Sequence, residues 1–166
     1  IPSATTEVER RAVRDAAMNA GAREVYLVEE PMAAAVGIRL PVQEPVGNMI
    51  VDVGGGTTDI AVISLGGIVS SRNIKTAGDV LDADIVHYAR DEFKMVIGAR
   101  TAEDMKIAIG SAWEEDEELE VSMRGRDLIT GLPREVVVTS NDLREAMARS
   151  IKHIVGSIKE TVEDTP

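Results

Sequence analysis

The chain has 166 residues, enough for one core of ordinary size or for one core with a small attached lobe, and its 44% apolar content excludes intrinsic disorder. Its net charge of −11 argues against a basic patch, so we expect no binding of nucleic acid and no direct contact with anionic membrane surfaces. The absence of cysteine excludes a disulfide framework, and no apolar run approaches the roughly 20 residues that span a bilayer. We therefore expect a cytoplasmic protein.

The first half of the chain predicts two helices, a short strand and a meander of three strands. Residues 5–21 carry Thr6 and Glu9 in the spacing of a capping box and apolar residues at helical spacing, which predicts a helix. Residues 23–30 predict a short buried strand, and Pro31 begins a second helix, because proline is well tolerated in a first helical turn. Three strand-like runs follow, at residues 48–53, 59–65 and 68–74.

The second half of the chain predicts a small lobe that is rich in helices. Residues 78–93 and 101–113 have helical spacing of apolar residues, and Trp113 is expected to anchor the core of this lobe. Residues 119–139 predict a hairpin, and residues 140–164 predict a long final helix.

Two groups of polar residues are better explained by solvation or packing than by a site. Residues 114–120 hold six carboxylates in seven positions, which is typical of a solvated loop or helix end and less often of a contact with a basic partner. His87 and His153 lie far apart in the sequence, with no further ligands at metal-binding spacing, so we expect them to serve packing.

The segment "VDVGGGTTD" at residues 51–59 is the strongest chemical signal in the chain. No lysine follows the glycines, so it is not a P-loop, and the next segment is strand-like, so it is not a dinucleotide fingerprint. Its bare backbone amides, with the hydroxyls of Thr57 and Thr58, could bind phosphate. Asp52 suits such a loop if a divalent cation accompanies the phosphate. These residues alone leave open a nucleotide site or a bulged hairpin turn.

Five stretches together resemble the MreB family of bacterial actin homologues, within the superfamily of actin-like ATPases. The D-x-G-G-G-T-T turn is shared across that superfamily, whereas "EEPMAAAVG" and "GRDLITGLP" narrow the resemblance to MreB. The remaining stretches are "AGDVLDADIV" and "TAEDMKIAIGSA". The chain departs from the family at Ala4, where Gly is usual, at Asp59, where Glu is usual, and in its more acidic segment 113–121.

The resemblance implies a catalytic centre for ATP hydrolysis. Glu30 is similar to the family's residue that orients the attacking water, and a carboxylate suits that task because it can position and partly deprotonate water. Asp52 is similar to the carboxylate that holds magnesium-bound water. Glu29 is expected to be structural.

The resemblance also implies the residues that bind the nucleotide. Gly54, Gly55, Gly56 and Thr57, followed by Thr58, resemble the family's second phosphate loop, which wraps the β- and γ-phosphates of ATP. Gly78 and Asp79 resemble the turn beside the ribose, and Glu103 and Lys106 resemble the pair that meets the sugar and adenine. Without the family, Glu103 and Lys106 would be interpreted as a surface ion pair on one helical face.

The implied fold is an α/β, ribonuclease-H-like, actin-type ATPase subdomain with a mixed sheet, formed by residues 1–77 and 140–166. A smaller α+β subdomain would be inserted at residues 78–139. The family's first phosphate loop and the later glycine-rich segment over the adenine are absent, so the chain is expected to be a fragment that begins inside a strand. The chain would then supply only one wall of the nucleotide site, which we call a half-site. We therefore expect the chain alone to bind ATP weakly or not at all.

The implied function is that of a filament-forming cytoskeletal protein that uses ATP and Mg²⁺ and guides cell-wall synthesis in rod-shaped bacteria. Its partners would be further copies of itself and adaptor proteins of cell shape and cell-wall synthesis, and the full-length protein would associate with the membrane through the missing domain. One rival is a small-molecule kinase or chaperone ATPase of the same superfamily. Another is a non-catalytic interaction module.

Overall fold

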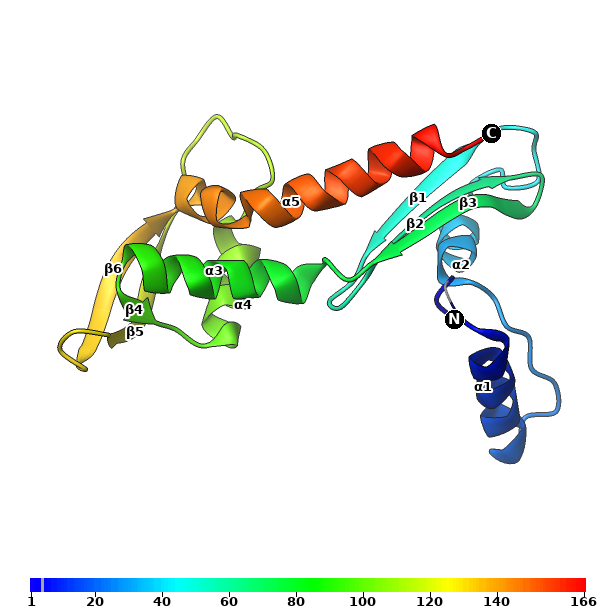
Figure 1. Cartoon of the computed structure of the whole chain (residues 1–166), viewed down its shortest axis with the longest axis horizontal. Coiled ribbons are helices and arrows are strands. Elements are labelled where there is room, and N and C mark those ends of the chain that lie inside the picture. The colour runs from blue at the N-terminus through cyan, green and yellow to red at the C-terminus, as the bar shows by residue number, and fades with distance from the viewer. Residues whose placement is uncertain (4) are drawn as a thin grey trace. The chain divides into compact units, whose positions relative to one another are not determined.

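The computed structural model describes residues 1–3 and 5–166, so Ala4 lies outside the described residues, and the chain forms two compact units (Figure 1). The meander unit comprises Ile1–Lys75 and Gly156–Pro166, and the hairpin unit comprises Thr76–Val155. This division differs from the expected one mainly in helix α5 (Ser140–Glu163). We expected this helix to belong wholly to the larger subdomain, but its first turns pack in the core of the hairpin unit.

The meander unit is built on three antiparallel strands in the order β1-β2-β3, as the sequence predicts. The strands are β1 (Asn48–Val53), β2 (Thr58–Ser64) and β3 (Gly67–Ile74). The central strand β2 is buried on both faces over residues 58–63. Such two-sided burial explains why its sequence is a nearly continuous apolar run.

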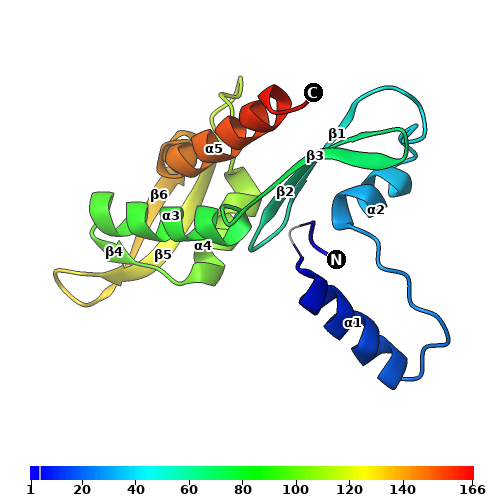
Figure 2. The same ribbon diagram turned by 45° about the vertical axis from the view of Figure 1, so that its right-hand side comes forward.

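Different elements cover the two faces of this sheet. Helix α2 (Glu30–Gly37) packs against β1 and β2, where Ala35 forms a small core with Ile50 and Ile63. On the other face, Arg72 forms ion pairs of 2.8 Å with Glu160 and Asp164, at the end of α5. Figure 2 shows α2 beside the meander.

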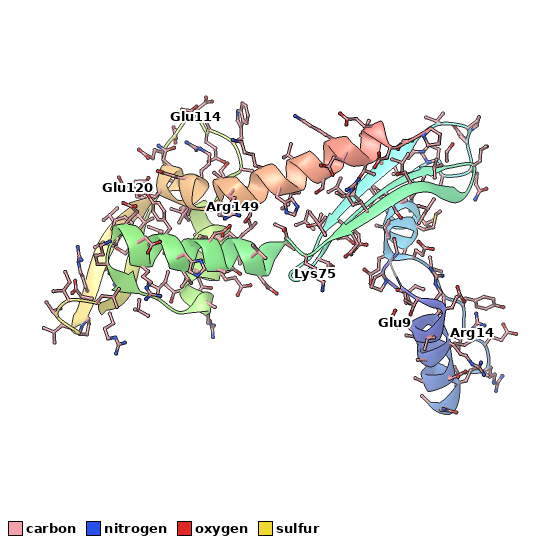
Figure 3. The ribbon with its side chains drawn as sticks, viewed as in Figure 1. Glu9, Arg14, Lys75, Glu114, Glu120 and Arg149 are labelled. Carbon is pink, nitrogen blue, oxygen red and sulfur yellow. The ribbon has the colours of Figure 1, made fainter. Side chains whose placement is uncertain are left out.

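Helix α1 (Glu7–Asn19) has the predicted capping box but contains no buried residue. Figure 3 shows its side chains, including Glu9 and Arg14, projecting from the ribbon. Thr6 accepts a hydrogen bond from the backbone N–H of Glu9, whose carboxylate in turn accepts one from the backbone N–H of Thr6. The capping residues rather than burial therefore define the beginning of this helix.

The strand predicted at residues 23–30 is wrong, because the segment before Glu30 is extended chain without ladder pairing, and Tyr26 is 82% exposed. Ile1 forms two backbone hydrogen bonds with this segment: its amino group donates to the carbonyl of Val28 at 2.8 Å, and its carbonyl accepts from the N–H of Glu30 at 2.9 Å. This is the pattern of parallel neighbours. Two hydrogen bonds to a single residue do not form a strand ladder.

The hairpin unit combines helices with a second antiparallel sheet, in the order β4-β5-β6. Its hairpin lies close to the predicted one, whereas the short strand β4 was not predicted. The elements before α5 are α3 (Gly78–Glu92), β4 (Met95–Val96), α4 (Ala99–Ile109), β5 (Glu120–Asp127) and β6 (Pro133–Thr139).

A continuous apolar core fills the hairpin unit between its helices and its sheet. Every element of the unit contributes to it: α3, β4, α4, the two hairpin strands and the first turns of α5. The largest fully buried side chains are those of Ile85, Met95, Met123, Val138 and Leu143. Trp113 does not anchor this core, contrary to our prediction, because it lies 82% exposed in the loop before β5 that also carries Glu114 (Figure 3). Aliphatic side chains and methionine fill the volume instead.

The stretch "GRDLITGLP" forms the turn of the β5–β6 hairpin, and Asp127 organises it. One carboxylate oxygen of Asp127 accepts hydrogen bonds from the backbone N–H groups of Ile129 and Thr130, at 2.9 and 2.8 Å. The other accepts one from Arg134 at 3.0 Å. These donors, chiefly the two backbone groups, lower the pKa of Asp127 to about 2. The carboxylate of Asp127 therefore stabilises the turn in which it lies.

Candidate functional site: the glycine loop and its acidic neighbours

The glycine-rich segment is the turn of the β1–β2 hairpin. Val53 and Thr58 form the last cross-strand pair, and the N–H of Gly54 donates to the carbonyl of Thr57 at 2.9 Å. All four residues of this loop, 54–57, are exposed. Both interpretations of the sequence remain compatible with this geometry, because a hairpin turn can also expose backbone amides to a ligand.

The glycines of this loop are not required by backbone strain. Neither Gly54 nor Gly56 has a left-handed φ. A Cβ on Gly54 would lie 3.3 Å from the carbonyl oxygen of Thr57, whereas a Cβ on Gly56 would meet nothing within 4 Å. The packing of the protein therefore does not explain Gly56. Bare backbone at this position leaves the loop open to close approach from solvent.

The two threonines of the motif have different surroundings. Thr57 is exposed at the loop, whereas Thr58 is fully buried on β2. The hydroxyl of Thr57 can therefore reach a ligand in solvent. The side chain of Thr58 is enclosed by protein, which favours a role in holding the end of the hairpin.

Asp52 begins a row of polar residues that crosses the sheet next to the loop. Asp52 on β1 pairs with Asp59 on β2, which pairs with Asn73 on β3. Asp52 is exposed, whereas Asp59 is buried and accepts a hydrogen bond of 2.9 Å from the side-chain amide of Asn73. Asp59 and Asn73 were not predicted as site residues. The signal in the sequence for Asp59 was a carboxylate within the largely apolar strand β2, whereas Asn73 follows the polar residues 70–72 of β3 and had no such signal.

Glu30 is the first residue of α2, and its side chain is exposed to solvent. Pro31 is buried directly after it and fixes the start of the helix. Glu29 forms an ion pair of 3.2 Å with Arg10, which gives it the structural contact that we expected. Of the two adjacent acids, Glu30 is therefore the one available to a substrate.

The remaining predicted residues lie in the hairpin unit, where Lys106 joins two helices. Its ammonium group donates to the carbonyl of Gly78 at 3.1 Å and lies 2.8 Å from a carboxylate oxygen of Asp82. The surface ion pair of Lys106 with Glu103 does not occur among the described residues, and Glu103 is exposed. Asp79 is exposed in the first turn of α3.

Asp82 is a residue that the sequence analysis missed. It is buried on α3 at the same helical spacing as Ile85 and Ala89. A carboxylate at a core-facing position requires a partner, since burying an unpaired charge is costly. That position was the available signal for an ion pair with Lys106.

The predicted site residues thus form two groups, one in each unit. Glu30, Asp52 and residues 54–58 belong to the meander unit, and Gly78, Asp79, Glu103 and Lys106 belong to the hairpin unit. Neither histidine joins a metal cluster: within residues 1–3 and 5–166 there is no group of three or more His, Cys, Asp or Glu side chains arranged for a metal ion. His153 instead contacts the hydroxyl of Thr76 at 2.8 Å.

The family model for the MreB/Mbl protein matches residues 1–166. The chain belongs to the MreB/Mbl family. It is 47% identical over 165 residues to the cell shape-determining protein Mbl of Bacillus subtilis, a match that covers 99% of this chain and 50% of that protein. It is 48% identical over 166 residues to the cell shape-determining protein MreB of Escherichia coli, covering 100% of this chain and 48% of that protein.

Solved structures of this MreB/Mbl family show the same actin-like fold. The crystal structure of MreB5 of Spiroplasma citri bound to AMPPNP matches with a TM-score of 0.95 at 42% identity, covering 99% of this chain and 50% of that one. The ADP-bound structure of the same protein matches with a TM-score of 0.94. The chain therefore spans about half the length of the MreB and Mbl relatives that it matches. No helix in its described part is long and apolar enough to cross a membrane.

Proposed function

We propose that this chain is part of a longer actin-like ATPase of the MreB/Mbl family that assembles into filaments and determines cell shape by guiding cell-wall synthesis. The observation that carries the proposal is the exposed glycine loop at Gly54–Thr57, which follows the exposed carboxylate of Asp52 on β1, in a chain related throughout its length to cell shape-determining proteins. Glu30 is exposed in the same unit. The AMPPNP- and ADP-bound states of MreB5 support a nucleotide as the ligand.

The loop fits the phosphates of ATP in its chemistry. Gly56 leaves room that no protein atom fills, so an anion can approach the backbone amides closely. Thr57 offers a hydroxyl donor to the same anion, and buried Thr58 holds the end of the hairpin. We infer that residues 54–57 bind the β- and γ-phosphates.

Asp52 and Glu30 supply the two carboxylates that hydrolysis needs. Bound Mg²⁺ would neutralise charge on the phosphates, and Asp52 would hold its water ligands, as suits a hard cation that retains water. Glu30 would orient the attacking water and accept its proton. Its exposure at the start of α2 leaves the carboxylate free for that contact.

The hairpin unit would bind the nucleoside. Gly78 and Asp79 would contact the ribose at the start of α3, and Glu103 and Lys106 would contact the sugar and adenine. The ion pair of Lys106 with Asp82, together with its hydrogen bond to the carbonyl of Gly78, would fix the lysine and the ribose turn relative to each other. We also propose that the subdomains of the family correspond to residues 1–77 with 140–166 and to the insertion 78–139, so that α5 counts with the larger subdomain although its first turns pack in the core of the hairpin unit.

The partners follow from the same proposal. Further copies of the protein would form the filament, and adaptor proteins of cell shape and cell-wall synthesis would bind it at the cytoplasmic face of the membrane. Membrane attachment would come from sequence outside this chain, which agrees with the net charge of −11.

Sedimentation of the full-length protein with and without ATP tests the proposal. Pelleting that depends on ATP and Mg²⁺ is the expected result, because the nucleotide state governs assembly. A soluble monomer that transfers phosphate to a small molecule would instead support the kinase. A protein that neither pellets nor turns over ATP would support the non-catalytic interaction module.

Calorimetry with Mg-ATP tests the half-site in this chain alone. We expect weak or undetectable binding and no meaningful hydrolysis, because one wall of the site cannot enclose the nucleotide. A dissociation constant in the micromolar range would contradict this expectation.

The variant Glu30→Ala in the full-length protein tests the catalytic role. Phosphate release should slow by about 10²-fold or more while ATP binding is retained, since the loss affects the attacking water and not the phosphate loop. Glu145→Ala, which removes an exposed carboxylate on α5, is the matched control. Unchanged phosphate release by Glu30→Ala would refute the assignment.

A further inference from the structure

The backbone of Glu30 is held in place although its side chain is exposed to solvent. Its N–H donates to the carbonyl of Ile1 at 2.9 Å, and Pro31 is buried directly after it. The carbonyl of Glu29 accepts the first hydrogen bond of α2, from the N–H of Ala33 at 2.9 Å. A carboxylate at a helix end can orient a water molecule reproducibly only if that helix end is itself held.

Glu29 is the N-cap residue of α2, yet its side chain does not cap the helix. An N-cap side chain usually accepts a hydrogen bond from a backbone N–H of the first turn. The carboxylate of Glu29 instead accepts a hydrogen bond of 3.2 Å from Nη2 of Arg10 on α1. The same guanidinium donates through Nε to the carbonyl of Thr5 at 3.3 Å. Arg10 therefore joins α1, the residues before α1 and the start of α2.

The ion pair of Arg10 with Glu29 is sheltered. Both side chains are 28% exposed, whereas those of the pair between Arg11 and Asp15 within α1 are 84% and 61% exposed. An exposed pair is screened by water and its geometry is loosely held, whereas a half-buried pair is screened less. In the described part of the chain, no other side chain of α1 forms an ion pair or hydrogen bond with residues 23–30. The polar link between α1 and the start of α2 is therefore specific to one arginine.

We propose that Arg10 is a positioning residue for ATP hydrolysis. Through Glu29 it holds the start of α2, and with it the carboxylate of Glu30, in the place that the attacking water requires; this inference rests on the proposed function of Glu30. Arginine suits the task because its planar guanidinium donates in several fixed directions, here to Glu29 and to the carbonyl of Thr5. Because Arg10 acts through Glu29 and not on the nucleotide, it should affect the rate of hydrolysis more than the binding of ATP.

The test in the full-length protein is the rate of phosphate release over a range of ATP concentrations. Arg10→Gln should lower the rate at saturating ATP about tenfold, because a displacement of about 1 Å at a reacting group is costly. The ATP concentration at half-saturation should change by less than about twofold. Arg11→Gln is the matched control and should leave both quantities unchanged, because it removes a neighbouring charge that pairs within α1. An unchanged rate in Arg10→Gln, or a loss confined to ATP affinity, would overturn the proposal.

A double-mutant cycle separates positioning through Glu29 from general stabilisation. Glu29→Gln should lower the rate as Arg10→Gln does, and the double variant should be no slower than the slower single variant, since both changes remove one contact. If Arg10→Gln fails to fold, Glu29→Gln decides, and its unchanged rate would overturn the proposal. Additive losses would also overturn it, because they would show that the two residues act independently.

Amide hydrogen exchange in this chain tests the geometry without nucleotide. Arg10→Gln should accelerate exchange at the N–H groups of Glu30 and Ala33, which are hydrogen-bonded at the start of α2, whereas Arg11→Gln should not. Unchanged exchange at both amides would contradict positioning by Arg10. A failure of the proposed function is distinguishable: unchanged phosphate release in Glu30→Ala would refute the catalytic role of Glu30, and with it the role of Arg10 in hydrolysis, even where exchange is accelerated.

Discussion

The two units differ in how completely they bury their apolar residues. The core of the hairpin unit is continuous and receives side chains from each of its helices and strands, whereas the buried cluster of the meander unit is small and centred on Ala35 and Ile63. The meander unit also carries exposed Val8, Val13 and Tyr26 on and beside α1. A helix with good capping and apolar spacing is therefore not necessarily a helix with a packing partner. We expect the stability of the hairpin unit to depend on packing and that of α1 to depend on local interactions.

The largest effect is expected from Leu143→Ala in the hairpin unit. Leu143 is fully buried in the core, so its truncation should lower the free energy of unfolding by about 2–5 kcal/mol. Val13→Ala on α1, where Val13 is 45% exposed, should change it by no more than about 0.5 kcal/mol. Urea denaturation followed by circular dichroism measures both. Equal losses for the two variants would show that the contrast between the units is wrong.

A smaller loss is expected from Gly125→Ala on β5. The added Cβ would lie 2.6 Å from the carbonyl oxygen of Val96 and 2.9 Å from Cγ2 of Ile97, so β4 or β5 must shift at a cost of about 1–3 kcal/mol. Gly156→Ala is the matched control, because its Cβ meets nothing within 4 Å inside α5 and alanine favours the helix by about 1 kcal/mol. Opposite signs in thermal unfolding are expected, and a destabilising Gly156→Ala would contradict this account.

Thr6→Ala should have a smaller and local effect. It removes the side-chain cap of α1, which costs about 0.5–2 kcal/mol, and α1 has no buried residue to compensate. Amide hydrogen exchange should accelerate in α1 while the amides of α3 and α4 stay protected. Thr6→Ser should restore protection, because serine is an equally good cap. Loss of protection in the hairpin unit would show that α1 supports more than itself.

The smallest effect, visible only in acid, should come from Asp127 in the β5–β6 turn. Its pKa is lowered to about 2 by hydrogen bonds from the backbone of Thr130 and Ile129. The stabilisation is therefore present above the ordinary pKa of an aspartate near 4 and is lost as pH falls through about 2. Asp127→Asn should flatten the dependence of stability on pH between these values. An unchanged acid transition would contradict the assignment.

The sequence predicted the elements whose signals are local. The capping box at Thr6, the apolar runs of the meander and the spacing of the final helix each needed only neighbouring residues. The predictions that were wrong depended on which distant residues pack or pair with a segment. Residues 23–30 have the composition of a strand but form no strand ladder in the described part of the chain, and Trp113 is large and apolar but lies in a loop.

The candidate site shows the same limit. The glycine loop was located correctly as a turn between strands, because glycine and strand signals are both local. The pairing of Lys106 with Asp82, the burial of Thr58 and the row from Asp52 to Asn73 depend on register and on contacts between helices. Hydrophobic periodicity contains no information about which residues meet across such contacts.

The exposure of Trp113 has a spectroscopic consequence. It is the single tryptophan of the chain and lies beside the acidic segment 114–118, outside either core. Its emission should already resemble that of indole in water, so unfolding will change its fluorescence little. The same property makes it a selective optical probe: quenching by a cationic or an anionic reagent will report the electrostatic potential of that loop without interference from the rest of the molecule.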